Sequence, residues 1–203
     1  MILSVPGMWE GENTNIMNSY LNVLSKFPAG DEREKAEQEM ILNLAEKEGD
    51  NLLLRSCLYA HLTASSIILN RDRTKTLFVW HNIYKSWAWT GGHCDGDPDF
   101  ERVARREAAE ETGIGALTCI GEGVASMEIL PVHAHMKRGR MVGTHLHLNV
   151  SYLFEAEETW PLRICPEENR DVRWIEIADI ERMCTEPDMI PVYLRLIRRA
   201  NVC

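Results

Sequence analysis

Residues 91–114 have the sequence GGHCDGDPDFERVARREAAEETGI, in which a glycine-rich stretch precedes a single helical segment. Asp97 followed by Pro98 is typical of a helix N-terminus, because an aspartate side chain caps free backbone N–H groups and proline fits the first helical position. Gly113 is typical of the residue that ends a helix. The sequence therefore predicts a helix over about residues 98–112 with well-defined ends.

One face of this predicted helix carries carboxylates among apolar residues. At about 100° per residue, Glu107 and Glu111 fall within the apolar stripe and Glu110 lies at its edge. The stripe consists of Phe100, Val103, Ala104, Ala108 and Ile114. Carboxylates on a core-facing side must pair, take up protons or bind a cation. Their mutual repulsion favours a divalent ion, and oxygen ligands favour Mg²⁺ or Mn²⁺ over zinc. The alternative is that they are solvated and paired with Arg105 and Arg106.

The same stretch resembles the signature of the Nudix hydrolases: a glycine, five residues, a glutamate, seven residues, and then R-E-U-x-E-E-x-G-U with U apolar. The matching residues are Gly92, Arg106, Glu107, Ala108, Glu110, Glu111, Gly113 and Ile114. The first glutamate of the signature falls instead on Pro98, between Asp97 and Asp99, and either aspartate is a candidate substitute. A weaker similarity to a bacterial branch with a GGHxDGD form of the box covers most of residues 15–180.

This resemblance implies an α/β fold, the Nudix α/β/α sandwich with a mixed β-sheet. It also implies cleavage of a phosphoanhydride bond in a nucleoside diphosphate linked to another group, by water and with Mg²⁺ or Mn²⁺ as cofactor. By the family pattern, the metal ligands would be the Gly92 carbonyl and the carboxylates of Glu107, Glu110 and Glu111. Arg106 would orient Glu107 through charge-assisted hydrogen bonds.

The family resemblance also implies a further acid, either a metal ligand or the general base, on the loop before the predicted strand Arg173–Ile177. Glu168 is preferred there over Glu167, and a solvated loop acid is the alternative. The residues predicted to contact substrate are Lys85, Trp87, Arg138, His145 and His147. Of Trp87 and Trp89, one would stack on a base and the other would belong to the core.

Four histidines lie at 133, 135, 145 and 147 in two alternating pairs, each on one face of a predicted strand. If the two strands are neighbours, the histidines would form a polar wall of the substrate cleft. A second, histidine-rich metal site and ordinary surface histidines are the alternatives.

The rest of the chain divides into an N-terminal helical extension (1–58) and the Nudix domain (59–203). Helices are predicted at Met17–Phe27 and Glu32–Lys47, the second with Asp31 as N-cap, Glu34 in a capping box, and Gly49 after its end. Apolar residues come late in this second helix, so we expect its first half to be solvated. The other predicted elements are strands at 61–69, 76–80, 87–90, 118–130, 132–136, 144–156 and 173–177, and helices at 179–184 and 188–200.

Composition narrows the class of protein. The formal charge of the 203 residues is −9 and the pI is about 5.3, which argues against a nucleic-acid partner. No apolar run is long enough to span a bilayer, and six dispersed cysteines indicate free thiols. We therefore expect a cytoplasmic enzyme that acts on a small nucleotide. The resemblance also allows a homodimer, an assembly that is common in the family. A Nudix domain that senses a nucleotide without cleaving it is the alternative, and a diphosphate isomerase is a third.

Overall fold

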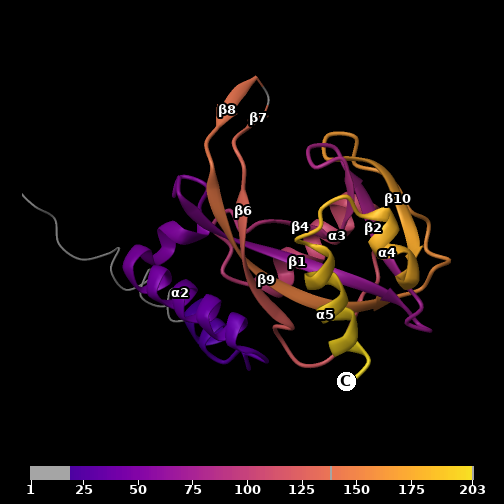
Figure 1. Ribbon diagram of the computed structural model, residues 1–203, viewed down its shortest axis with the longest axis horizontal. Coiled ribbons are helices and arrows are strands. Elements are labelled where there is room, and N and C mark those ends of the chain that lie inside the picture. The colour runs from indigo at the N-terminus through magenta and orange to yellow at the C-terminus, as the bar shows by residue number, and fades with distance from the viewer. Residues whose placement is uncertain (1–18, 138, 203) are drawn as a thin grey trace, which may run out of the picture.

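Helices pack around an eight-stranded mixed sheet in the computed structural model, which describes residues 19–137 and 139–202 (Figure 1). Residues 19–25 are helical, within the predicted first helix, whose residues 17 and 18 lie outside the described part of the chain. The elements that follow are α2 (Glu32–Glu48), η1 (Gly49–Leu53), β1 (Ala60–Asn70), β2 (Lys75–His81), β3 (Ser86–Ala88), β4 (Thr90–His93), α3 (Phe100–Thr112), β5 (Thr118–Cys119), β6 (Ser126–Val132), β7 (His135–Lys137), β8 (Arg140–Val142), β9 (His145–Ala156), β10 (Asn169–Glu176), η2 (Ile177–Asp179), α4 (Ile180–Met183) and α5 (Ile190–Ala200).

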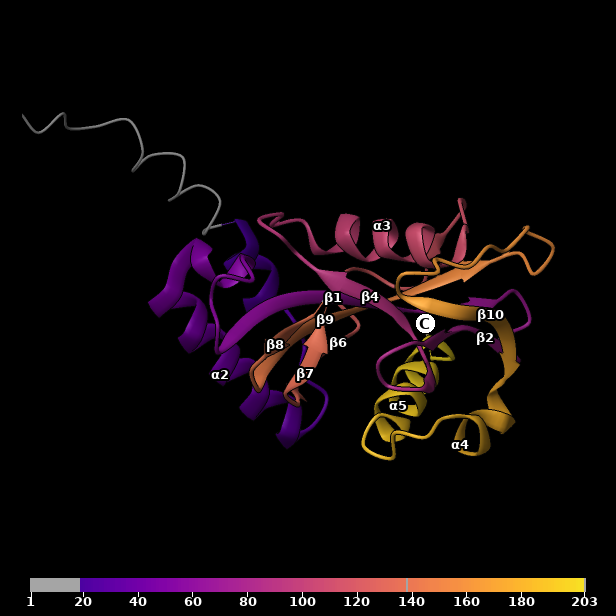
Figure 2. The same ribbon diagram turned by 90° about the horizontal axis from the view of Figure 1, so that it is seen from above.

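The sheet is built on β1 and β9, which run parallel to each other over their whole length. Its strand order is β10-β2-β1-β9-β5, with β3 added to β2, β4 to β1 and β6 to β9, all in antiparallel pairs. Figure 2 shows α3 on one face of the sheet and α5 on the other. The predicted α/β fold with a mixed sheet between helices is confirmed. No helix in the described ranges has the length and hydrophobicity needed to cross a bilayer.

Two apolar clusters hold these layers together. The first joins the apolar stripe of α3 to the sheet and also contains Tyr20, Leu24, Ile41 and Ala45 from the N-terminal helices. The second lies between the sheet and α5. Because Tyr20 packs edge to face on Phe100, with ring centroids 6.3 Å apart, the N-terminal helices share a core with the helix that carries the acidic residues.

Two details differ from the sequence-based prediction. The N-cap of α3 is Asp99, whose side chain accepts a hydrogen bond from the backbone N–H of Arg102, so the prediction of Asp97 was wrong by two residues. Asp97 instead accepts from the Asp99 N–H, which forms a turn ahead of the helix. The predicted strand 118–130 is also interrupted: Gly121 and Gly123 have positive φ and separate β5 from β6.

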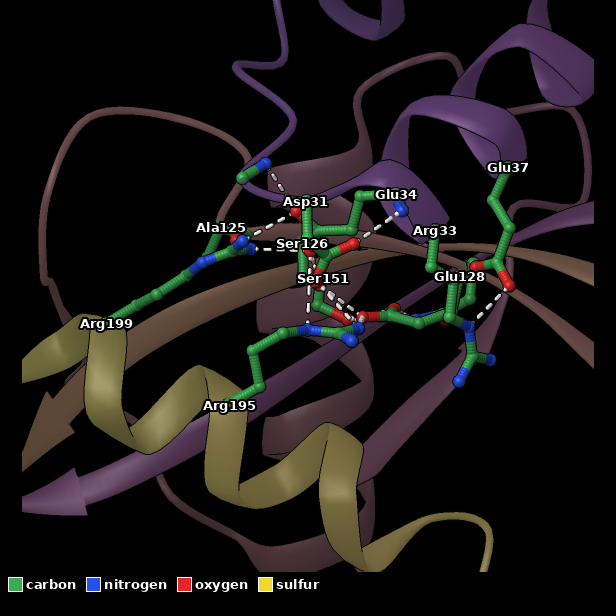
Figure 3. A network of polar contacts seen from close by, with 12 residues as sticks. Asp31, Arg33, Glu34, Glu37, Ala125, Ser126, Glu128, Ser151, Arg195 and Arg199 are labelled. Atoms are coloured by element: carbon green, nitrogen blue, oxygen red, sulfur yellow. Dashed lines mark hydrogen bonds and ion pairs between the residues drawn. The ribbon is translucent and has the colours of Figure 1, made fainter.

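A buried polar network ties α2 to β6 and α5 (Figure 3). Glu34 of α2 accepts two hydrogen bonds from the Arg199 guanidinium, at 2.7 and 2.6 Å, and its side chain is fully buried. Arg195 contacts both Glu34 (3.3 Å) and the equally buried Glu128 (3.0 Å). The expectation that the first half of α2 is solvated was therefore wrong at Glu34, because two arginines of α5 neutralise a carboxylate there.

Candidate functional site

Three carboxylates converge where the C-terminal half of α3 meets the loop before β10. Glu107, Glu111 and Glu168 each offer an oxygen atom, and these atoms all lie within 4.8 Å of one another. The Glu107 side chain is 12% exposed, Glu111 is 2% exposed, and Glu168 is open to solvent. Such a group, with two members held in the protein and one facing water, has the ligand type and spacing that a hard divalent cation requires.

The glycines of β4 hold the two helix carboxylates in place. The backbone N–H of Gly91 donates to Oε1 of Glu111 at 2.9 Å. A Cβ on Gly92 would lie 2.3 Å from the Glu107 carboxylate carbon, so only glycine leaves room for that side chain. Arg106 donates from the same nitrogen to Oε1 of Glu107 (2.9 Å) and to the carbonyl of His93 (3.1 Å). Strand β4 and helix α3 therefore fix the acidic group from both sides.

Asn169 attaches the Glu168 loop to the helix. Its buried side-chain amide donates to the backbone carbonyl of Glu111 at 2.9 Å. The Glu168 carbonyl in turn accepts from the N–H of Asn82 at 2.9 Å, in the turn between β2 and β3. Asn169 is not among the site residues predicted from the sequence. The local sequence indicates its role only in that it directly follows the two candidate acids, Glu167 and Glu168. This asparagine places a loop carboxylate beside two helix carboxylates.

Burial and mutual repulsion disfavour the ionised form of the group. Burial raises the pKa of Glu111 well above its ordinary value, the Gly91 N–H opposes this, and the charges of Glu168, Glu107 and Glu110 add to it. Burial also raises the pKa of Glu107, against the opposing effect of Arg106. A divalent cation would remove this cost, so the carboxylates present fit Mg²⁺ or Mn²⁺.

The other acids of the predicted site lie outside this group. The Glu110 side chain is 62% exposed and its carboxylate lies 4.0 Å from the Arg106 guanidinium. Asp97 is hydrogen-bonded to Arg102 at 2.8 Å and lies 3.8 Å from Arg106. Arg102 lowers the pKa of Asp97. Pro98 occupies the position of the signature glutamate. Of the two aspartates beside it, Asp97 connects the loop to α3 through Arg102 and Arg106.

The residues predicted to contact substrate are dispersed. Lys85 lies in the β2–β3 turn, which touches the Glu168 loop through Asn82. Trp87 is 5% exposed and packs edge to face on Trp80, and Trp89, at 9% exposure, packs edge to face on Tyr193 of α5. Both belong to the α5-side cluster. Both tryptophans are therefore buried in the core. This burial disfavours the prediction that one of them stacks on a base. Arg138 lies outside the described residues.

The histidines group differently from the prediction. His145 and His147 of β9 lie against His61 of β1 and His93 of β4, with ring centroids 4.9–5.1 Å apart. The strands that carry the 133/135 and 145/147 pairs are neighbours, as the β6–β9 and β7–β8 ladders show, but His135 is paired with Val142 and the ring contacts of His145 and His147 are to His61 and His93. The β6–β9 ladder ends at Val132 opposite His145, and the chain then enters the separate β7–β8 hairpin. Burial lowers the pKa of His61.

Substitution of Gly92 by Ala tests the arrangement of β4 against α3. The new methyl group would displace the Glu107 carboxylate, and we expect Mn²⁺ affinity to fall about 10–100-fold because a ligand leaves its position. Isothermal titration calorimetry with Mn²⁺ measures this, and thermal melting without metal verifies the fold. Wild-type Mn²⁺ affinity in a folded Gly92→Ala protein would show that Glu107 need not lie where the structure places it.

Known structures share this architecture. The E. coli dihydroneopterin triphosphate pyrophosphohydrolase aligns with a TM-score of 0.54 and 11% identity, over 68% of this chain and 94% of that one. The M. smegmatis Nudix hydrolase RenU aligns with a TM-score of 0.50 and 16% identity, over 70% and 84%. The C. elegans Ap4A hydrolase binary complex gives 0.49 and 18%, over 70% and 95%. At these identities the likeness concerns the fold alone.

Comparison of the sequence with known families identifies the family, which the structural likeness alone does not. No curated protein matches the chain. The NUDIX domain family, however, matches residues 60–196, from the first strand of the sheet to the last helix. This match includes the acidic helix, the glycines of β4 and the Glu168 loop, and covers more than half of the chain. The chain therefore belongs to the Nudix family.

Proposed function

We propose that the protein is a Mg²⁺- or Mn²⁺-dependent Nudix pyrophosphohydrolase that cleaves a phosphoanhydride bond in a nucleoside diphosphate linked to another group. The observation that carries this proposal is the convergence of Glu107, Glu111 and Glu168 within 4.8 Å. Hydrolysis of such a bond depends mainly on charge neutralisation and positioning, for which a carboxylate-bound cation is well suited.

The proposed roles combine the family pattern with the observed contacts. Glu107, Glu111 and the Gly92 carbonyl would hold the cation, and Glu110, which is 62% exposed and lies outside the carboxylate group, would join them by the family pattern alone. Arg106 orients Glu107 through its 2.9 Å hydrogen bond. When bound, the cation supplies neutralisation of phosphate charge and a lowered pKa for water. Glu168 is exposed and lies next to the buried pair, which supports a role in accepting a proton from the attacking water or in adding a ligand oxygen.

Substrate contacts belong to the same proposal. Lys85, on the turn that touches the Glu168 loop, would bind a phosphate. His145 and His147 of β9 would line the substrate cleft. Arg138, which lies outside the described residues, is proposed as a substrate contact from the sequence alone. The acidic net charge does not oppose a phosphate substrate, because bound divalent cations reverse the local sign.

A panel of nucleotide sugars, dinucleotides, nucleoside triphosphates and CoA esters tests the function. We expect phosphate-containing products from at least one class, only with Mg²⁺ or Mn²⁺ present. The sensing alternative rests on Pro98, where the signature has glutamate. It would be favoured by a panel compound that binds tightly and is recovered intact after long incubation with Mg²⁺.

The raised carboxyl pKa values predict a pH-dependent effect of metal on stability. The pKa values of Glu107 and Glu111 are higher in the folded than in the unfolded state, so their protonated forms stabilise the metal-free protein below about pH 4.5. This contribution to stability is lost as the pH rises through the raised pKa values. Mg²⁺ binds the ionised carboxylates and restores stability at higher pH. The melting temperature gained on replacing EDTA by saturating Mg²⁺ should therefore increase from pH 5 to pH 8. An equal gain at both pH values would contradict the assignment of Glu107 and Glu111 as ligands.

A further inference from the structure

Four of the seven histidines of the chain meet on one face of the sheet, with ring centroids 4.9–5.1 Å apart. His61 is paired in register with His147 across the parallel β1–β9 ladder, and His145 lies two residues earlier on the same face. His93 of β4 is opposite Thr63, two residues beyond His61, and so shares this face too. Three neighbouring strands thus bring four imidazoles together.

Hydrogen bonds orient two of these rings as metal ligands. Nδ1 of His61 lies 3.2 Å from the carbonyl of Cys57, and Nδ1 of His145 lies 2.8 Å from the carbonyl of Gly143. A carbonyl oxygen can only accept, so each Nδ1 carries the proton, and the lone pair of the neutral form of each ring is at Nε2. Metal-binding histidines are commonly fixed in this way, with the second nitrogen donating to a backbone carbonyl.

The Nε2 atoms point toward one another. The nitrogen ligand atoms of His61, His145 and His147 lie within 4.8 Å of one another, and Nε2 of His145 is 3.2 Å from Nε2 of His147. Neighbouring nitrogens in a tetrahedral zinc site, with bonds of about 2.0–2.1 Å, are about 3.3 Å apart. His61 is 5% exposed, and nothing in the described part of the chain forms a hydrogen bond to its buried Nε2. A buried nitrogen lone pair that accepts no hydrogen bond is energetically unfavourable, and coordination to a cation would remove this cost.

We propose that His61, His145 and His147 form a second metal site, which takes Zn²⁺ or a similar transition-metal ion. Imidazole nitrogen is a ligand for such ions, whereas the carboxylate oxygens of Glu107, Glu111 and Glu168 suit Mg²⁺. Three protein ligands leave a fourth position for water or a substrate group. The two sites adjoin, since one nitrogen of Arg106 bonds both the Glu107 carboxylate and the carbonyl of His93. The proposal does not rest on the hydrolase function, because metal binding is measured without substrate.

The test uses the purified full chain, stripped of metal by a chelator and loaded with Zn²⁺ or Co²⁺ in excess Mg²⁺. We expect one tightly bound Zn²⁺ per chain that Mg²⁺ does not displace, and a visible Co²⁺ absorption band of the intensity typical of four-coordinate sites. X-ray absorption of the wild-type Zn²⁺ protein should show nitrogen or oxygen neighbours at about 2.0 Å with imidazole features. Sulfur neighbours at about 2.3 Å, an all-oxygen shell, or no Zn²⁺ retained against Mg²⁺ would overturn the proposal.

Variants locate the ion independently. His147→Ala, at a partly exposed position, should weaken Zn²⁺ binding by about 100-fold or more. His135→Ala, the matched control on the β7–β8 hairpin, and Glu111→Gln, which alters the carboxylate group, should both leave Zn²⁺ affinity unchanged. If Glu111→Gln abolishes Zn²⁺ binding and His147→Ala does not, the ion lies in the carboxylate group and the proposal fails. The wild-type absorption spectrum decides the matter should His147→Ala not fold.

Discussion

Glu111→Gln is expected to lower kcat/KM for the phosphoanhydride substrate by about 10³-fold, which corresponds to about 4 kcal/mol of transition-state stabilisation. Glutamine has nearly the same shape, and its amide oxygen can still accept the hydrogen bond that Gly91 donates at 2.9 Å. The fold should therefore persist. What is lost is a negative ligand at the most buried position of the acidic group, where Glu111 is 2% exposed. Steady-state kinetics at saturating Mg²⁺ with the substrate found in the panel measures the effect.

A control on the same helix separates this effect from a general change in charge. Glu101 pairs with Arg105 at 2.7 Å, two to three turns before Glu111, and contacts none of the acidic group. Glu101→Gln makes the same chemical change, and we expect activity within about twofold of wild type because an exposed ion pair contributes little. Circular dichroism and melting in EDTA test the fold of both variants. Mg²⁺-dependent turnover at the wild-type rate in Glu111→Gln would refute the proposed role of the acidic group.

The sequence predicted the acidic helix well because its determinants are local. The apolar stripe, the position of the glutamates on it and the Gly113 end all depend on residues a few positions apart, and α3 ends at Thr112 with Gly113 in the left-handed conformation. The N-cap was misplaced because Asp97 and Asp99 flank Pro98 and both suit a helix start. Asp97 forms a turn and Asp99 forms the cap.

The side-chain clusters that depend on loop placement and strand pairing were harder to predict from the sequence. Spacing within one helix places Glu107 beside Glu111, but the loop acid reaches them through Asn169, 58 positions away from Glu111. The family pattern suggested Glu168, whereas residue periodicity alone could not. Likewise, nothing local indicates that His61 lies opposite His147, because this requires the register of two parallel strands distant in sequence. The alternation at 145 and 147 places these two histidines on one face of a strand, but it carries no information on the contacts with His61 and His93.

The polar first half of α2 shows the same limit. Amphipathic periodicity marks Glu34 as a solvated residue, yet its side chain is fully buried. The compensating charges of Arg195 and Arg199 come from α5, and Arg199 is 165 positions away from Glu34. A helix pattern describes only the helix itself, and it cannot predict which oppositely charged element will cover a polar face.

Glu34→Ala is therefore expected to lower the free energy of unfolding by about 3–5 kcal/mol, the cost typical of removing one member of a buried ion pair. Glu34 accepts hydrogen bonds from Arg199, from the Gly30 N–H at 2.8 Å and from Ser126 at 2.9 Å. Arg199 would keep the carbonyl of Ala125 and Ser126 would keep Glu128 as acceptors, but Arg199 would lose its buried ionic partner. Arg195 would keep Glu128 and Ser126. Urea denaturation in EDTA, which excludes any contribution from bound metal, measures the loss.

Two further variants identify the cause of that loss. Glu32→Ala removes a carboxylate from the same helix, where Glu32 pairs with Lys35 at the surface, and should change stability little. The double variant Glu34→Met, Arg199→Met removes a buried charge of each sign together, so its cost should be well below the sum of the single costs. Additive losses, or a loss below about 1 kcal/mol for Glu34→Ala, would contradict a charge-compensated network. In this network α2 supplies the carboxylate that pairs with Arg195 and Arg199 of α5, so removal of residues 1–58 should destabilise the remaining domain for the same electrostatic reason.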